Sequence, residues 1–230
     1  MDWLQNILEL DKEFFLYLNS FHNDFWDTIM LMITRKETWI PFYVVILYFI
    51  INNYRLKALS IMVFLALSIL LSDQISGFLK ESIQRFRPVY DPVIGPLVHN
   101  VLRKGSEYGF VSSHAANGFA IFIFTSRIFK NPNYRYLILF WAVLFAYSRI
   151  YSGVHYPLDI IGGAVLGWGI GELCFRLLMF FENRYLISRP PEIAKTQLNN
   201  SQSQTILLVF AVLMFTVFSV SGILHHYGYL

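Results

Sequence analysis

The sequence predicts an all-α membrane protein, a polytopic bundle of about six transmembrane helices preceded by N-terminal interfacial helices. Hydrophobic residue types make up 56% of the 230 residues and charged types only 14%, whereas soluble domains carry about 25% charged residues. Several apolar windows also approach the roughly 20 residues that a helix needs to cross a bilayer. This composition excludes a disordered chain and argues against a soluble globular enzyme.

Composition also limits the possible chemistry. A single cysteine, Cys174, excludes an internal disulfide framework and a zinc cluster built from thiolates. The formal charge of +3 is too small to indicate nucleic acid as a partner. At this length the chain is most simply one domain. Because the first residues lack the features of a cleaved signal peptide, we expect an uncleaved spanning segment to insert the chain.

The expected elements follow in chain order. Residues 1–34 carry apolar stripes interrupted by acidic residues such as Asp11 and Asp27, which favours interfacial helices over a seventh span. Apolar windows then occupy residues 39–51, 58–79, 113–129, 136–147, 160–181 and 205–224. The polar connection before the last window predicts a flexible cytoplasmic loop. We therefore expect one membrane domain with an interfacial part (1–36), a catalytic core (37–181), a cytoplasmic loop (182–204) and an extra C-terminal transmembrane helix (205–224).

Three glycines, Gly163, Gly167 and Gly171, recur every four residues in the fifth window. They form a ridge of small residues on one helix face, which lets a neighbouring helix approach closely. We expect this ridge to serve packing and not catalysis.

Ionisable residues gather at the ends of several spans on one side of the predicted membrane. Such residues are costly at membrane depth and tend to indicate function. Lys80 and Arg87 are seven residues apart, so both can project from one helix face, and Pro88 then turns the chain outward. Taken alone, such a pair more often consists of basic side chains that reach toward a membrane interface.

A second group opens the window at residues 113–129. Ser112 or Ser113 is suited to cap this helix, and the unpaired N–H groups of its first turn form an anion site. His114 lies in that first turn, where its ring can point toward the anion. A single histidine in this position more often makes an ordinary hydrogen bond.

A third group lies between the windows at 136–147 and 160–181. Arg149 ends one span, and Pro157 suits the first turn of the next helix. Asp159 falls in that turn and can reach back to His155, fixing its tautomer and making its other nitrogen a better base or nucleophile. The alternative is that Asp159 is only a favourable charge at a helix N-terminus. Together the three groups supply cations and amides for phosphate oxygens, and two histidines for attack and protonation.

These residues resemble a known family. The segments Lys80-x6-Arg87-Pro88, Ser112-Ser113-His114 and Ser148-Arg149-x5-His155-x3-Asp159 are similar to the three-part signature of the type 2 phosphatidic acid phosphatase superfamily. The resemblance spans roughly residues 58–181, and its first and third parts match fully. The middle part usually contains Pro-Ser-Gly-His, whereas this chain has Val111-Ser112-Ser113-His114.

The resemblance implies a metal-independent, cofactor-free membrane lipid phosphatase. His155 would be the nucleophile that forms a phosphohistidine, Asp159 its orienting partner, and His114 the acid for the leaving group. The phosphate would be held by Lys80, Arg87, Arg149 and the amides around Ser112 and Ser113. The compact chain and its short outer loop, residues 88–111, suggest a bacterial envelope lipid as the substrate. Lipid A phosphate, undecaprenyl diphosphate, phosphatidylglycerophosphate and phosphatidate are all open. A non-catalytic lipid-binding or transport protein is the alternative, but it does not explain why the histidines and cations gather together.

The positive charges of the connections predict the orientation. Nine lie on one side, Arg55, Lys57, Arg127, Lys130, Arg135, Arg176, Arg184, Arg189 and Lys195. Nine lie on the other, Lys12, Arg35, Lys36, Lys80, Arg85, Arg87, Arg103, Lys104 and Arg149. Setting aside the three candidate phosphate ligands leaves nine against six. We therefore expect the first side to be cytoplasmic, and the site to face the periplasm or exterior of a bacterial inner membrane.

Overall fold

The computed structural model describes residues 2–102, 105–186 and 190–227, so Arg103, Lys104 and Arg189 of the charge balance lie outside the described residues. Within these ranges the chain is helical and has no strand, which confirms the predicted all-α class. The helices are α1 (Asp2–Asn19), α2 (Asp24–Thr34), α3 (Ile40–Tyr54), α4 (Ala58–Ile83), α5 (Ser113–Phe129), α6 (Pro132–Tyr151), α7 (Pro157–Phe181) and α8 (Asn200–His226).

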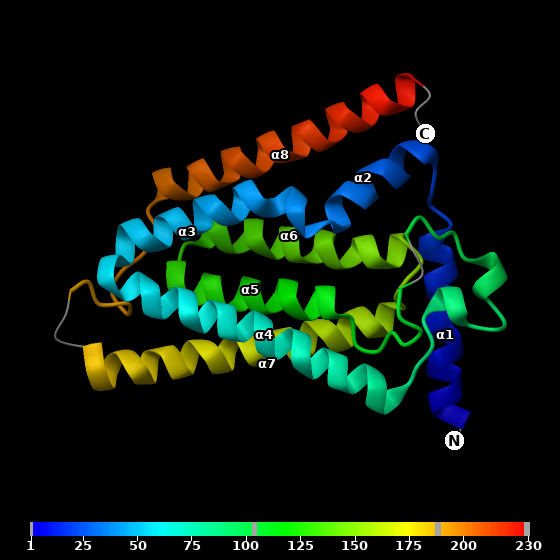
Figure 1. Ribbon diagram of the computed structural model, residues 1–230, viewed down its shortest axis with the longest axis horizontal. Coiled ribbons are helices and arrows are strands. Elements are labelled where there is room, and N and C mark those ends of the chain that lie inside the picture. Colours follow the sequence, from blue (N-terminus) through cyan, green and yellow to red (C-terminus); the bar gives the residue numbers. More distant parts are fainter. Residues whose placement is uncertain (1, 103–104, 187–189, 228–230) are drawn as a thin grey trace.

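Helix α5 is the centre of the bundle and packs against α4, α6 and α7. Figure 1 shows these four helices lying along the long axis of the molecule, with α3 and α8 beside them. Helix α1 instead crosses one end of the bundle. Helix α2 packs against α6 and α8.

Local capping explains why several helices begin earlier than their apolar windows. Helix α6 starts at Pro132 because the Asn131 side chain accepts a hydrogen bond from the Tyr134 N–H. Helix α7 starts at Pro157 because the Asp159 side chain accepts one from the Tyr156 N–H. Hydropathy alone does not detect these polar first turns.

Three helical stretches are long and apolar enough to cross a membrane among the described residues. They are Lys36–Ile83, which contains both α3 and α4, then Pro157–Leu186 and Asn200–His226. Helices α5 and α6 are not included in these stretches, and both carry polar residues of the candidate site. The count of six spans therefore stays a prediction.

The glycine ridge of α7 faces α5. A Cβ atom added to Gly163 would lie 2.5 Å from the Ser112 carbonyl oxygen, and one added to Gly171 would lie 2.8 Å from that of Ala120. One added to Gly167 would overlap the carbonyl oxygen of Ala116. The ridge thus lets α7 pack directly on the α5 backbone, and this contact fixes the start of α5 next to the start of α7.

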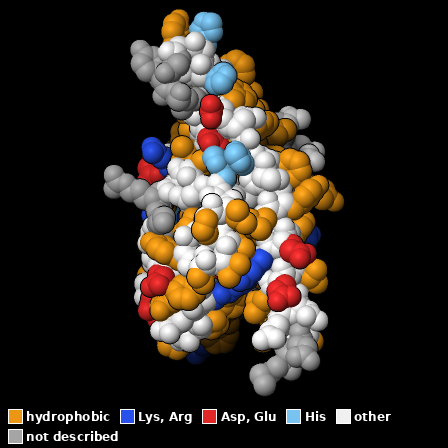
Figure 2. All heavy atoms as spheres, turned by 90° about the vertical axis from the view of Figure 1, so that its right-hand side faces the viewer, with side chains coloured by type: hydrophobic (Ala, Val, Ile, Leu, Met, Phe, Trp, Pro, Cys, Tyr) orange, Lys and Arg blue, Asp and Glu red, His pale blue; other side chains and the backbone are white. Residues whose placement is uncertain are grey.

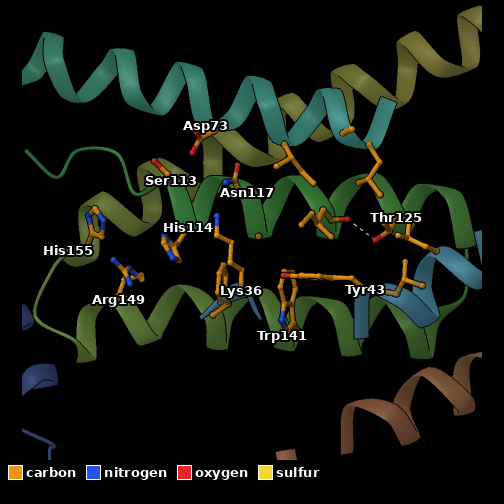
Figure 3. A pocket seen from close by; sticks show the side chains of 18 of the residues that line it. Lys36, Tyr43, Asp73, Ser113, His114, Asn117, Thr125, Trp141, Arg149 and His155 are labelled. Atoms are coloured by element: carbon orange, nitrogen blue, oxygen red, sulfur yellow. Dashed lines mark hydrogen bonds between the residues drawn. The ribbon is translucent and has the colours of Figure 1, made fainter. Parts of the chain in front are cut away.

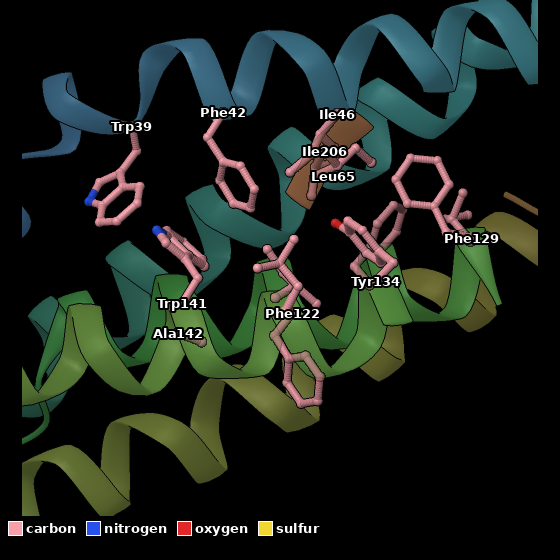
Figure 4. Packing of buried hydrophobic residues seen from close by; sticks show 14 of the residues in the cluster. Trp39, Phe42, Ile46, Leu65, Phe122, Phe129, Tyr134, Trp141, Ala142 and Ile206 are labelled. Carbon is pink, nitrogen blue, oxygen red and sulfur yellow. The ribbon is translucent and has the colours of Figure 1, made fainter. Parts of the chain in front are cut away.

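Aromatic side chains fill the core between α3, α6 and α8 (Figure 4). Trp39 stacks on Phe210 with ring centroids 5.7 Å apart and meets Trp141 edge-on at 6.0 Å. Its indole N–H donates to the Ile33 carbonyl at 2.8 Å. The last helix is therefore packed into the same core as the helices that carry the candidate site.

The connection predicted as a flexible loop is anchored where the structure describes it. Glu182 forms a buried ion pair with Lys57 at 2.6 Å and accepts a hydrogen bond from the Ile193 N–H at 2.8 Å. Lys130 donates to the carbonyl oxygens of Ile193 and Ala194. The connection is therefore held by ion pairs and hydrogen bonds to other parts of the chain, and its local composition does not reveal these contacts.

Candidate active site

A cavity of about 740 Å³ lies between α3, α4, α5 and α6 and reaches the loops at one end of the bundle. Six residues predicted from the sequence line it, namely Lys80, Arg87, Ser113, His114, Arg149 and His155. Figure 3 shows His155, Arg149 and His114 facing the same end of this cavity. The structure thus brings together groups that are up to 75 residues apart in the chain (80 to 155).

His155 and Asp159 form the predicted pair. The Nδ1 atom of His155 lies 3.3 Å from Oδ2 of Asp159, and both side chains are buried. A proton on Nδ1 directed at the carboxylate leaves Nε2 unprotonated, with a lone pair that can act as a nucleophile. The ring also makes a hydrogen bond with the Gly109 backbone. Burial, and then the positive charges of Arg149, Arg87 and Lys80, hold the pKa of His155 well below its ordinary value of 6.5. The ring is therefore neutral at neutral pH, as a nucleophile requires.

Arg85 is part of this arrangement and is not predicted from the sequence as a site residue. Its Nη1 donates to Asp159 Oδ1 at 2.9 Å, and its Nη2 donates to Asp11 Oδ2 at 2.6 Å. The guanidinium also lies 4.3 Å from the ring centroid of Tyr156. The only sequence signal is a second arginine two positions before Arg87.

Helix α1 supplies Asp11 and also braces the neighbouring loops. The other carboxylate oxygen of Asp11 accepts a hydrogen bond from the Leu158 N–H at 3.0 Å. Lys12 forms an ion pair with Asp91 at 2.7 Å. Figure 2 faces this end of the molecule and shows a short band of Lys and Arg side chains set among hydrophobic ones. The N-terminal helix therefore holds the backbone and the charges around the candidate site.

Three predicted cations surround the space beside His155. Lys80 contacts the Ser113 hydroxyl, which is also 2.7 Å from that of Ser76. Arg87 is oriented by hydrogen bonds from Nε to the Tyr108 carbonyl at 3.1 Å and from Nη2 to the Ser106 hydroxyl at 2.8 Å.

Arg149 has unused donor capacity. It donates from Nη1 to Thr34 at 2.7 Å, while its buried Nε has no partner among the described residues. A buried donor left unpaired is costly unless a ligand accepts from it. Since Arg149 lines the same cavity as Lys80 and Arg87, a phosphate placed there would meet three cations.

The start of α5 has the expected helix cap. Ser112 is the helix cap, since its hydroxyl accepts from the Ala115 N–H at 3.4 Å. The Ser112 N–H, however, donates to the Asp159 carbonyl at 3.0 Å, so this amide is not available to a phosphate. That corrects the expected donor set: the first-turn amides of Ser113 and His114, which have no acceptor within the helix, are the remaining candidates.

His114 lies across the cavity end from His155. Its ring packs at 33° against Phe145, with centroids 5.0 Å apart. Contact with an aromatic ring fixes the plane of the imidazole without using either nitrogen. No hydrogen bond to either ring nitrogen is found among the described residues, so both can act on a bound group.

The rest of the cavity is mostly apolar and extends between α3 and α4. Its walls include Ile46, Met62 and Leu65. Two lining residues of α4, Ala66 and Asp73, are exposed, so the cavity reaches the surface along this helix. Exposed Val63 and Leu70 flank this opening, so it faces a surface suited to lipid chains.

No group of three or more His, Cys, Asp or Glu residues in the described part of the chain is placed to hold a metal ion. The expectation of metal-independent chemistry stays a prediction.

The sequence of this chain is similar to a known protein family and to several named proteins. The model of the PAP2 superfamily matches residues 57–183, which contain all three parts of the resemblance. Lipid A 4'-phosphatase of Bacteroides thetaiotaomicron is 37% identical over 176 residues, covering 75% of this chain and 78% of that protein. The protein of the same name from Porphyromonas gingivalis is 36% identical over 186 residues, covering 80% and 79%.

A solved structure has a similar fold. The transmembrane PAP2-type phosphatidylglycerolphosphate phosphatase from Bacillus subtilis superposes with a TM-score of 0.55, covering 78% of this chain and 88% of that chain. The two sequences are 24% identical. The likeness supports the helical architecture described above.

Proposed function

We propose that this chain, which belongs to the PAP2 superfamily and is a membrane lipid phosphatase, hydrolyses the 4'-phosphate of lipid A. The observation that carries a phosphatase mechanism is the buried His155–Asp159 pair at 3.3 Å beside three cations. The family match and the phosphatase names of the relatives favour this activity over the alternative of a non-catalytic binding or transport protein. The roles of individual residues, given below, are part of the proposal.

In the first step, Nε2 of His155 attacks phosphorus and the bond between phosphorus and the ester oxygen breaks. Lys80, Arg87 and Arg149 neutralise the non-bridging oxygens, on which charge accumulates in the transition state. Asp159 keeps the Nδ1 proton directed at itself and stabilises the imidazolium that forms. His114 gives its proton to the departing oxygen, so the lipid leaves as an alcohol.

In the second step, water replaces His155. His114, now neutral, takes a proton from the water as its oxygen attacks phosphorus, and the bond between phosphorus and Nε2 breaks. Inorganic phosphate leaves, and His155 is neutral again. The same histidine thus acts as acid and then as base, as microscopic reversibility requires for such a two-step transfer.

The choice of lipid A rests on the two lipid A 4'-phosphatases, each of which aligns over at least three quarters of this chain. Undecaprenyl diphosphate, phosphatidylglycerophosphate and phosphatidate are the competing substrates. We also propose the domain division 1–36, 37–181, 182–204 and 205–224, with the site on the non-cytoplasmic face of a bacterial inner membrane. The nine-to-six balance of positive charges supports this orientation.

The deciding experiment measures phosphate release by the purified protein from each of these four lipids in the same detergent. We expect kcat/KM for lipid A to exceed the others by about tenfold or more. A different preferred lipid would contradict the substrate. A substrate with a labelled phosphate should transfer the label to the protein during turnover, and this label should be lost in acid because phosphohistidine is acid-labile. A label on the protein that survives acid, or an acid-labile one that still forms in His155→Ala, would contradict His155 as the nucleophile.

A further inference from the structure

Three polar side chains line the cavity next to His114, on the side away from His155. Figure 3 shows Lys36 reaching up toward Asn117, with Asp73 beyond them on the opposite wall. Lys36 precedes α3, Asp73 belongs to α4 and Asn117 to α5. Three separate segments therefore direct an ammonium, a carboxylate and an amide into one part of a cavity that is otherwise mostly apolar.

Asn117 carries the clearest indication of a ligand. Its Oδ1 atom is buried and has no hydrogen-bond partner among the described residues. A buried polar atom without a partner is costly, so its presence beside a cavity indicates that a bound molecule supplies the partner. Asn117 lies three residues after His114 on α5, so the two side chains share one face of the helix.

The position of these groups defines which part of the substrate they meet. In the proposed reaction the phosphate lies between His155 and His114, and His114 protonates the departing oxygen. Lys36 and His114 line the same cavity (Figure 3). Atoms bonded to the departing oxygen must therefore enter the space bordered by Lys36, Asn117 and Asp73.

The charges of Lys36 and Asp73 indicate which chemical groups this part of the substrate carries. A second phosphate would be attracted by Lys36 but repelled by Asp73, and a hydrocarbon chain would leave all three groups without partners. Hydroxyl and amide groups can both donate and accept hydrogen bonds, so they can pair with a carboxylate, an ammonium and an amide together. A sugar ring that carries acylamino and hydroxyl groups satisfies this set.

We propose that Lys36, Asn117 and Asp73 form a sugar-binding subsite that recognises the acylated amino sugar bonded to the departing oxygen. This inference rests on the proposed function and names the residues that select its substrate. The subsite favours glycolipid phosphates over glycerolipid and prenyl phosphates, because the latter bring fewer or no hydrogen-bonding groups to this position.

The test compares three substrates in one detergent: lipid A, dioleoyl phosphatidate and farnesyl diphosphate. For Asn117→Ala and Lys36→Met we expect kcat/KM with lipid A to fall about tenfold or more. With the other two substrates it should change less than about threefold, which also shows that the variants are folded. Asn52→Ala and Lys195→Met make the same chemical changes at exposed positions outside the cavity and should leave all three activities unchanged.

Either of two other outcomes would contradict the proposed sugar-binding subsite. Equal losses on all three substrates would mean that these residues serve the phosphate chemistry and not the sugar. Unchanged activity with lipid A would mean that they do not contact the substrate. If the wild-type protein releases phosphate from phosphatidate or farnesyl diphosphate but not from lipid A, the proposed function itself fails, and this result is separate from any effect of the variants.

Discussion

The Arg85 guanidinium joins the Asp159 carboxylate to helix α1, with Nη1 2.9 Å from Asp159 Oδ1 and Nη2 2.6 Å from Asp11 Oδ2. Asp159 thereby accepts hydrogen bonds at both oxygens, from Arg85 at one and from the Tyr156 N–H at the other. A carboxylate fixed in this way holds the His155 ring in a single orientation. Arg85 is therefore a positioning residue for the proposed nucleophile.

Replacing Arg85 should lower kcat far more than it changes KM. We expect Arg85→Ala to lose about 10- to 100-fold in kcat, as is typical when an outer partner of a reacting group is removed. Arg85→Lys should recover part of the loss, and Asp11→Asn should show a smaller loss. Steady-state kinetics with lipid A measures this. Arg176→Ala, which breaks an exposed pair with Glu172, is the control, and a wild-type kcat for Arg85→Ala would contradict the role.

Ser113 tests whether the α5 amides bind phosphate. Ser113→Gly keeps the N–H and should retain activity within about tenfold, because among the described residues the hydroxyl contacts only Lys80 and Ser76. Ser113→Pro removes the N–H and should lose about a hundred- to a thousandfold in rate. Turnover is compared after matching expression and thermal stability. A fully active proline variant would show that this amide does not hold phosphate.

The glycine ridge offers a matched pair for stability. Gly167→Ala places a methyl group against the Ala116 carbonyl, whereas Gly169→Ala on the same helix meets nothing within 4 Å. We expect the first to cost about 1–3 kcal/mol of stability and the second to be neutral or slightly stabilising. Melting in detergent distinguishes them. Because α7 carries Asp159, activity should fall in Gly167→Ala only, and equal effects of the two changes would contradict the packing.

The buried, neutral His155 predicts a pH effect on stability. Its folded-state pKa is well below the ordinary 6.5, so below pH 6.5 the unfolded chain binds a proton that the folded chain does not. This group therefore costs no stability above pH 6.5, and stability is lost as the pH falls below that value. From pH 6.5 to 5.5 the loss is about 1 kcal/mol, or about 2–4 °C in apparent Tm.

The measurement is the apparent Tm in detergent at both pH values, for the wild type and His155→Gln. The glutamine variant cannot titrate here, so its Tm should fall less over the same interval. An identical fall in the two proteins would mean that His155 does not resist protonation in the folded state.

Orientation is tested by labelling introduced cysteines in intact cells, in a Cys174→Ala background. Leu97 is 70% exposed in the loop between α4 and α5, at the site end of the bundle, and Asn52 is exposed near the end of α3. A membrane-impermeant reagent should label Leu97→Cys in intact cells and Asn52→Cys only after permeabilisation. The reverse pattern would place the site at the cytoplasmic face.

The sequence predicts the residues of the proposed chemistry better than it predicts their supports. Lys80, Arg87, His114, Arg149 and His155 all line one cavity, since their spacings match a family pattern within or next to single helices. Asp11 could not be predicted as a partner of Arg85, because 74 residues separate them and an acidic residue in an interfacial helix is unremarkable.

Two further features could not be predicted from the sequence, for similar reasons. The Ser112 amide is occupied because the glycine ridge brings the Asp159 carbonyl to it, and this is a tertiary contact between two helices. Asn117 lies one turn beyond His114, but nothing in its local sequence indicates that its Oδ1 atom is buried with no hydrogen-bond partner among the described residues. Local patterns specify helices and reacting groups, whereas contacts between helices decide which donors remain free.

The opening of the cavity along α4, at Ala66 and Asp73, changes what substrate concentration means for this protein. A lipid that enters sideways travels in the plane of the bilayer and is never dissolved in the surrounding water. Saturation is then governed by the mole fraction of substrate among all the lipids of the leaflet. Adding inert lipid slows the reaction even when the total amount of substrate per volume stays constant.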